Sequence, residues 1–244
     1  MCEKCSSNLL HPLAPSRRSV VLFAASALGL MLADATNAKG TKAPPKPQNV
    51  LSPDAALKRL MEGNARYVDG TSRRHDFKHE REALVGGQNP YAAVLSCADS
   101  RIAPEYAFDS ARGDLFVCRV AGNFANDETV ASMEYAVAVL ATPLILVLGH
   151  DSCGAVDATI KSLKDDKPLP GHIPSLVAAI APSVKAAAQQ SGNALDNAIR
   201  QNVIDNVAKL KSAAPILNAA VEQNKLKVVG GIYRLATGKV EPVS

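Results

Sequence analysis

The stretch PLILVLGHDSCGAV, residues 143–156, joins a continuous apolar run to the start of a helical pattern. A run of aliphatic residues this short is typical of a strand that is buried on both faces. Two similar runs precede it, YAAVLSC at 91–97 and DLFVCRVAG at 114–122. Helical patterns follow the second and third runs, at 126–140 and 153–163. Apolar strands that alternate with helices predict an α/β fold, with a mostly parallel sheet flanked by helices on both faces.

The segments outside this centre extend the same pattern. A helix is expected at 52–67, because Ser52 is a good N-cap and Pro53 suits the first helical position. This helix forms an N-terminal arm with one apolar face. Beyond the third strand, the spacing of apolar residues predicts helices at 175–190 and 193–213 and a short one ending near residue 224. A final strand pair, LKVVGGIYRL and GKVEPV, is joined by a turn at residues 236–238.

Composition excludes several classes of protein. The chain has 244 residues, of which 47% are apolar, so it can bury one sizeable core. A net charge of +4 without a basic block, and an aromatic content of 4%, argue against a nucleic-acid partner. The five cysteines are an odd number at irregular spacings, which is not the pattern of a disulfide-stapled domain.

The N-terminal 38 residues read as an export signal rather than as part of the fold. Arg17 and Arg18 precede the apolar run VVLFAASALGLMLA, and small residues offer cleavage sites after Ala35 or Ala38. The arginine pair favours a twin-arginine signal, with a general secretory signal or a retained membrane anchor as alternatives. Residues 39–50 are expected to be a Pro- and Lys-rich linker, and residues 51–244 are expected to form the folded domain. We therefore expect a periplasmic or secreted protein with no membrane contact after signal removal.

Chemically active side chains follow the first and third strands. His150 ends the third strand, and Cys153 opens the next helix, where the helix dipole is expected to lower the pKa of its thiol. Gly154 allows a ligand to approach the backbone closely. After the first strand, Cys97 and Asp99 fall on the same side of an extended chain. Ligands in open α/β sheets bind at these carboxyl ends of strands, so the two groups are expected to meet.

Two thiols with an imidazole favour a tetrahedral zinc site. A disulfide between Cys97 and Cys153 and a thiol nucleophile with His150 as its base are the alternatives, and neither explains the carboxylate and guanidinium of Asp99 and Arg101. The remaining candidates have simpler interpretations. Cys118 lies within a strand and is expected to act as a small hydrophobe, whereas three histidines are expected in solvated positions: His75, His79 and His172. The Cys2–Cys5 pair lies in the segment expected to be removed.

CADSR and GHDSCG, about fifty residues apart, resemble the paired motifs C-x-D-x-R and H-x-x-C of the β-class carbonic anhydrases. The similarity covers residues 51–240 and includes the stretches GQNPYAAVLSCADSR, LFVCRVAGN, SMEYAV and GGIYRLATGKV. The family's usual Arg-Asn-Ala-Gly-Asn has valine at its second position here, Val120, which does not alter a ligand.

The resemblance implies a role for each residue of the motifs. One Zn²⁺ per subunit would be held by Cys97, His150 and Cys153. Asp99 would pair with Arg101, or become a fourth zinc ligand in a closed state. Gln88 stands where the family has its substrate-orienting glutamine and resembles the open subgroup. Phe116 and Tyr135 stand where the family lines an apolar substrate cleft, to which Gly154 would also contribute.

The implied function is reversible hydration of carbon dioxide to bicarbonate and a proton by hydroxide on zinc, as catalysed by a carbonate dehydratase, which is a lyase. The resemblance also implies a homodimer or homotetramer with each cleft at a subunit boundary, and we expect helix 52–67 to lie over the partner. Hydrolysis of carbon disulfide or carbonyl sulfide on the same fold is one alternative. A non-catalytic zinc-stabilised binding protein is the other.

Overall fold

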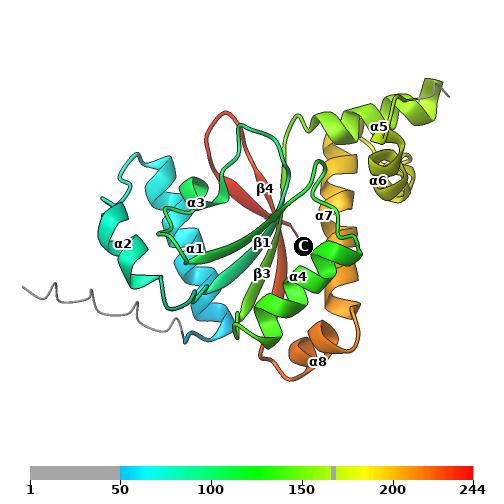
Figure 1. The fold of residues 1–244 in the computed structure, drawn as a ribbon. Coiled ribbons are helices and arrows are strands. Elements are labelled where there is room, and N and C mark those ends of the chain that lie inside the picture. The colour runs from blue at the N-terminus through cyan, green and yellow to red at the C-terminus, as the bar shows by residue number, and fades with distance from the viewer. Residues whose placement is uncertain (1–49, 166–168, 244) are drawn as a thin grey trace, which may run out of the picture. The chain divides into compact units, whose positions relative to one another are not determined.

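A central sheet organises the computed structural model, which describes residues 50–165 and 169–243 (Figure 1). Within this part of the chain the strand order is β2-β1-β3-β4-β5. The strands are β1 (Ala92–Ser96), β2 (Leu115–Arg119), β3 (Leu144–His150), β4 (Lys227–Tyr233) and β5 (Val240–Val243). All neighbours are parallel except β4 and β5, which form the expected antiparallel pair. The prediction of a mostly parallel sheet is confirmed. The segments predicted to be the export signal and nearly all of the linker lie outside the described residues.

The helices cover both faces of this sheet (Figure 1). They are α1 (Pro53–Val68), α2 (Phe77–Ala83), α3 (Pro104–Ala107), α4 (Asp127–Ala138), α5 (Gly154–Asp165), α6 (Ile173–Ala187), α7 (Ala194–Ser212) and α8 (Ile216–Glu222). Helices α1 and α3 lie on one face, while α4 and α7 lie on the other with α8 between their ends. Helices α5 and α6 pack together, and α6 rests on α7. None of the helices in the described ranges is long and apolar enough to cross a membrane.

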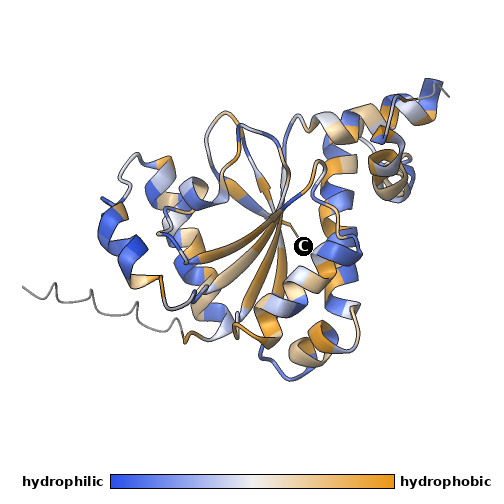
Figure 2. Ribbon diagram, in the orientation of Figure 1, coloured by the Kyte–Doolittle hydropathy of each residue, from blue (hydrophilic) through white to orange (hydrophobic). Residues whose placement is uncertain are grey.

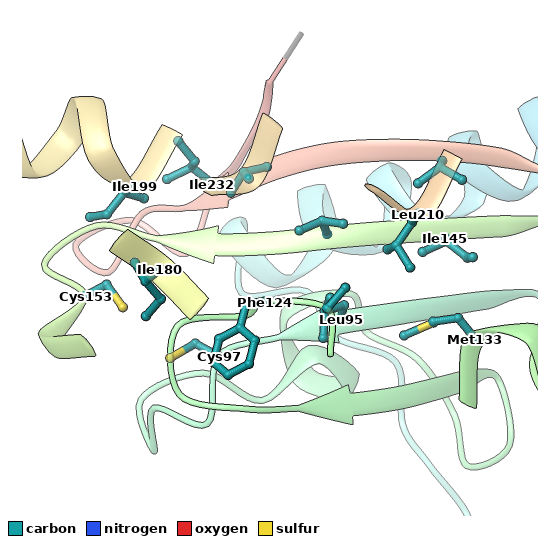
Figure 3. Packing of buried hydrophobic residues seen from close by; sticks show 14 of the residues in the cluster. Leu95, Cys97, Phe124, Met133, Ile145, Cys153, Ile180, Ile199, Leu210 and Ile232 are labelled. Carbon is teal, nitrogen blue, oxygen red and sulfur yellow. The ribbon is translucent and has the colours of Figure 1, made fainter. Parts of the chain in front are cut away.

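Alternate residues of the strands fill two separate cores, as the period of two along a strand requires. Ala92 and Val94 of β1 point into the core under α1, whereas Ala93 and Leu95 point toward α4 and α7. Figure 2 shows the strands as the most apolar part of the fold, and Figure 3 shows the core on the α4 and α7 side. Burial of both strand faces is therefore the main reason that the sheet forms where the apolar runs predict.

Helix α1 begins as the sequence predicts. The Ser52 side chain accepts a hydrogen bond from the Ala55 backbone N–H at 3.3 Å, and Pro53 occupies the first helical position. Its buried residues Ala56 and Leu60 pack against the subunit's own sheet, while Leu57 and Met61 are only partly buried. The expectation that this helix lies over a partner stays a prediction.

Helix α7 approaches the sheet closely because glycine replaces larger residues on two adjacent strands. A Cβ atom added to Gly149 of β3 would lie 2.6 Å from Val203 Cγ2, and one added to Gly230 of β4 would lie 2.6 Å from Val203 Cγ1. One valine of α7 thus fills the space above both glycines. This contact sets α7 directly against the strand end that carries His150.

Candidate metal centre

The predicted ligands meet at one edge of the sheet. Strands β1 and β3 are parallel neighbours, so Cys97 and His150 leave the sheet side by side. Cys153 returns to them through a tight turn in which Ser152 has a φ of 53°, and it directly precedes α5. The sulfur atoms and a ring nitrogen of these three residues all lie within 4.8 Å of one another. All three side chains are buried.

His150 presents an unprotonated nitrogen to the two sulfurs. Its Nδ1 lies 2.8 Å from the backbone carbonyl oxygen of Asp151, which can only accept, so in the neutral ring Nδ1 carries the proton and Nε2 does not. Nε2 is buried and has no hydrogen-bond partner among the described residues. A buried acceptor without a donor is costly, and beside two thiols it has the arrangement of a metal ligand. The residues present therefore fit Zn²⁺.

Asp151 is itself held firmly. Its backbone N–H donates to the Tyr233 carbonyl at 3.2 Å, and its carboxylate accepts from the Leu235 N–H at 3.0 Å. Both partners belong to the end of β4 and the turn that follows it. The orientation of the His150 ring is thus fixed from the neighbouring strand.

The two thiols differ in the ease of ionisation. Contact with Cys153 lowers the pKa of Cys97 to about 4. The same contact, together with burial, raises the pKa of Cys153, although the N–H groups of Val156 and Ala155 at the start of α5 act in the opposite direction. The N–H groups at the start of α5 thus lower the pKa of Cys153 as the helix N-terminus predicts, while the contact between the two sulfurs acts against them.

Asp99 is fixed beside this group by Arg101. The backbone N–H and Nε of Arg101 each donate to Asp99 Oδ1 at 2.9 Å, and Nη2 donates to Oδ2 at 2.6 Å. These hydrogen bonds hold the pKa of Asp99 well below its usual range, so the carboxylate stays ionised. Asp99 Oδ2 lies 3.9 Å from His150 Nε2. The pairing expected between Asp99 and Arg101 is present, and both carboxylate oxygens are engaged by Arg101.

Two further residues support the site and were not assigned a role from the sequence. Arg119, at the end of β2, donates from Nε to the Cys97 carbonyl at 3.0 Å and from Nη2 to the Asp99 carbonyl at 2.7 Å. The Gly122 N–H donates to Cys97 Sγ at 3.3 Å. Strand β2 adjoins β1, so the rule that ligands gather at carboxyl strand ends, applied to the second strand as well, could have found both.

Of the remaining predicted site residues, Gly154 directly follows the ligand Cys153, whereas Gln88, Phe116 and Tyr135 are not gathered around the three ligands. Gln88 is exposed and precedes β1, whereas Cys97 follows it, so the two lie beyond opposite ends of one strand. Phe116 pairs with Ala93 in the first half of β1, and its ring lies 6.2 Å from that of Tyr135, whose exposed fraction is 47%. Gly154 is exposed, with open space where a Cβ would stand.

The simpler interpretations of Cys118, His79 and His172 agree with the structure, whereas the His75 side chain is only 21% exposed and so is not in the solvated position expected for it. Cys118 is half-buried against the core, and burial raises the pKa of its thiol. His75 contacts Glu80 at 3.1 Å, while His79 contacts Asp76. His172 is exposed at the start of α6. In the described ranges, the only group of three or more potential metal ligands that lie this close is the one formed by Cys97, His150 and Cys153.

Comparison with known proteins agrees with this geometry. A family model described as carbonic anhydrase matches residues 92–240. The carbonic anhydrase of Mycolicibacterium smegmatis is 39% identical over 191 residues, which cover 78% of this chain and 93% of that protein. Carbonic anhydrase 2 of Mycobacterium tuberculosis is 38% identical over 189 residues, covering 77% and 91% of the two chains. The solved structure of Coccomyxa β-carbonic anhydrase in complex with acetazolamide has a TM-score of 0.60 and 29% identity, covering 76% of this chain and 85% of that one.

The fold and the cysteine–histidine–cysteine group define an α/β protein with a candidate metal site at the carboxyl edge of its sheet. The chain belongs to the β-carbonic anhydrase family. This membership confirms the predicted enzyme class, a carbonate dehydratase, which is a lyase.

Proposed function

We propose that this protein is a zinc enzyme that catalyses the reversible hydration of carbon dioxide. The observation that carries the proposal is the position of an ionised, Arg101-held Asp99 carboxylate 3.9 Å from the unpartnered Nε2 of His150. A structural zinc site would need its ligands but not this carboxylate and its guanidinium. Zinc held by Cys97, His150 and Cys153 would supply the Lewis acidity that makes water a nucleophile near neutral pH.

The chain's own residues then orient the reaction. Asp99 Oδ2 accepts a hydrogen bond from the attacking water, which turns an oxygen lone pair toward carbon dioxide. Arg101 keeps that carboxylate ionised and turned toward itself. The water oxygen bonds to the substrate carbon, one proton of the water leaves to buffer, and bicarbonate is the product.

The arrangement of Asp99 supports an open site. A closed site requires the carboxylate to leave Arg101 and occupy the metal's fourth position. Here both carboxylate oxygens accept hydrogen bonds from Arg101. We expect the hydration rate to be sustained near pH 7, and a near-zero rate there that recovers steeply above about pH 8 would contradict an open site.

The position of Gln88 supports assembly. Because Gln88 and Cys97 lie beyond opposite ends of β1, Gln88 can orient substrate only at the site of a second copy. A homodimer or homotetramer with clefts at subunit boundaries would provide this, and it would also cover the exposed ring of Tyr135 beside Phe116. Mixing two inactive variants, Gln88→Ala and Asp99→Ala, should restore part of the activity if each site uses both chains. No recovery after exchange of subunits would contradict a shared site.

The main test is metal content measured together with the hydration rate. We expect one zinc per chain and a stopped-flow hydration rate that Asp99→Asn lowers by about 10²-fold or more without loss of zinc. Hydrolysis of carbon disulfide or carbonyl sulfide is the rival on the same ligands, and sulfide release without measurable hydration would favour it. Zinc-loaded protein that is inactive in both assays would point to a zinc-stabilised binding protein.

We also propose export by the twin-arginine route, which carries proteins that are already folded. Zinc would then be loaded in the reducing cytoplasm, before Cys97 and Cys153 meet oxidant. Replacing Arg17 and Arg18 by lysine should retain the protein in the cytoplasm. Equally active, zinc-loaded enzyme after forced export through the general secretory route would contradict the loading order.

A further inference from the structure

Helix α7 carries two buried asparagines whose presence requires an explanation. Asn202 and Asn206 lie one turn apart on its inner face and are 1% and 7% exposed. The Asn206 side-chain amide donates to the Asn202 carbonyl at 2.7 Å and lies 3.1 Å from its side-chain oxygen. Asparagine is a poor helix former, and a buried amide is costly unless its groups are paired. An apolar residue would serve packing alone better at either position.

Both asparagines reach out of the helix to the loop between β2 and α4. Asn202 Nδ2 donates to the Gly122 carbonyl at 2.8 Å. Three residues further along the loop, the Ala125 N–H donates to Asn206 Oδ1 at 2.7 Å. Lys209, on the next turn of α7, donates to the Ala125 carbonyl at 2.5 Å. Helix α7 therefore holds the loop at two points through consecutive turns.

The same loop touches a metal ligand. Gly122 is held on one side by Asn202, and its N–H donates to Cys97 Sγ at 3.3 Å. Its φ of 89° is open mainly to glycine, and an added Cβ would lie 2.4 Å from Ile180 Cδ1. Figure 3 shows Ile180 and the sulfurs of Cys97 and Cys153 gathered at this end of the core. The direction of the Gly122 N–H thus depends on contacts made from α6 and α7.

We infer that Asn202 and Asn206 are positioning residues for the metal centre, because they hold the loop so that the Gly122 N–H stays directed at Cys97 Sγ. The inference rests on the proposed zinc centre. An N–H donated to a thiolate withdraws electron density from the sulfur, so that the sulfur donates less to the metal. A metal bound by two thiolates has little positive charge left, and this hydrogen bond preserves part of it.

Cobalt(II)-substituted enzyme provides the test, because the energy of its thiolate-to-cobalt charge-transfer band reports electron donation by sulfur. In Asn202→Leu the loop loses its tether, the N–H···S bond weakens, and the band should move to longer wavelength. Asn206→Leu should move it in the same direction by a smaller amount, because the tether to Gly122 remains. The hydration rate of the zinc enzymes should fall by about 10–100-fold and about 2–10-fold respectively, as for other partners of metal ligands.

Asn64→Leu is the matched control. Asn64 is also a buried helical asparagine, and its side chain bonds three backbone groups, those of Ala107, Gly238 and Val240, on the opposite face of the sheet. The Asn64→Leu variant should lose about as much stability as Asn202→Leu, but its cobalt band should stay at the wild-type wavelength. A general effect of destabilisation on the site would move the band in this variant as well.

Each outcome bears on the inference. An unchanged band in folded, cobalt-loaded Asn202→Leu overturns it, as does an equal shift in Asn64→Leu. If Asn202→Leu does not fold, Asn202→Ser replaces it, and an unchanged band there has the same meaning. Failure of all the Asn202 and Asn206 variants to fold, while Asn64→Leu folds, would make the pair a folding determinant and also overturn the inference. A wild-type protein that shows no thiolate-to-cobalt band would instead contradict the proposed zinc centre.

Discussion

If the site is open as proposed, replacing Arg101 by alanine should close it at neutral pH. In the structure, Arg101 supplies all three of the hydrogen bonds described for the Asp99 carboxylate, two from the side chain and one from the backbone. The variant keeps only the backbone N–H, which bonds Oδ1. Oδ2, at 3.9 Å from His150 Nε2, is then free to turn toward the metal position.

Arg101→Ala should lower the hydration rate strongly but change the stability of the fold little. The Arg101 side chain is 52% exposed, so solvent screens its ion pair with Asp99 and the melting temperature should change little. Loss of a partner that orients a group at a metal site lowers activity by about 10–100-fold. We expect a loss of this size at pH 7 and a smaller one at pH 9, because hydroxide then competes with the carboxylate for the metal.

Protonation of Asp99 cannot produce this pH dependence. Arg101 lowers the pKa of Asp99, so the stabilisation from their pairing is present above the carboxyl's ordinary pKa of about 3.9 and is lost only at lower pH. Without Arg101 the pKa rises toward that ordinary value, which is still far below the assay range. Any change between pH 7 and pH 9 must therefore come from the position of the carboxylate and not from its charge.

The assay is stopped-flow hydration of carbon dioxide at several pH values, with zinc per chain measured on each preparation. Arg101→Lys should be intermediate, since lysine keeps the charge but not the fork of donors. Lys161→Ala removes a comparably exposed ion pair, 2.6 Å from Asp157 on α5, and should leave the rate unchanged. The reasoning would be refuted if zinc-loaded Arg101→Ala kept more than half of the wild-type rate near pH 7. It would also be refuted if the hydration rate fell by the same factor at pH 7 and at pH 9.

Three further predictions concern stability. Zinc at about a thousandfold excess over its dissociation constant would add about 4 kcal/mol to the free energy of unfolding. Chelation should therefore lower the melting temperature by about 8–16 °C, and an unchanged calorimetric melt would contradict metal binding. Burial raises the pKa of Asp109, but the contacts with Arg66 and Arg73 lower it by more, so the pKa lies below its ordinary value. The ionised carboxylate therefore stabilises the folded protein above about pH 4, and this contribution is lost as the pH falls further. Asp109→Asn should therefore cost about 1–3 kcal/mol in urea unfolding near pH 7 and progressively less as the pH falls below about 4, and a cost that does not change with pH would contradict this assignment. Gly149→Ala should lower the free energy of unfolding by about 1–3 kcal/mol, because the added methyl group would collide with Val203. Combining it with Val203→Ala should recover part of that loss. Additive losses in the double-mutant cycle would show the contact to be unimportant.

The parts of the fold that the sequence predicts are those decided by local pattern. The three central strands follow from apolar runs, and the start of α1 follows from Ser52 and Pro53. Helices α2 and α3 were missed because their stability does not come from an apolar repeat. No residue of α2 is buried, and the Asp76 side chain caps its first turn. Helix α3 is only four residues long.

The candidate site likewise has features that local sequence pattern predicts and features that it does not. Cys97, His150 and Cys153 could be placed together because each stands at the carboxyl end of a neighbouring strand or directly after it. The pKa shifts of the two thiols could not be predicted, because they arise from contact between the two sulfurs, which only the fold creates. Asn202 gives no local signal at all, since only the folding of α7 onto the sheet brings it to Gly122.

The supporting contacts at this site all act against the negative charge that two thiolate ligands would bring to a metal. Two thiolates formally cancel the charge of a divalent metal, so they weaken the acidity that water gains there compared with three neutral imidazoles. The chain opposes this in two ways. Backbone N–H groups draw charge from the sulfurs, from Gly122 on Cys97 and from the start of α5 on Cys153. Arg101 and Arg119 add two cations to the Asp99 segment, one on its carboxylate and one on its carbonyl. In the proposed zinc centre, the surrounding peptide groups and arginines would then offset the charge that the thiolate ligands introduce, and water could be activated there.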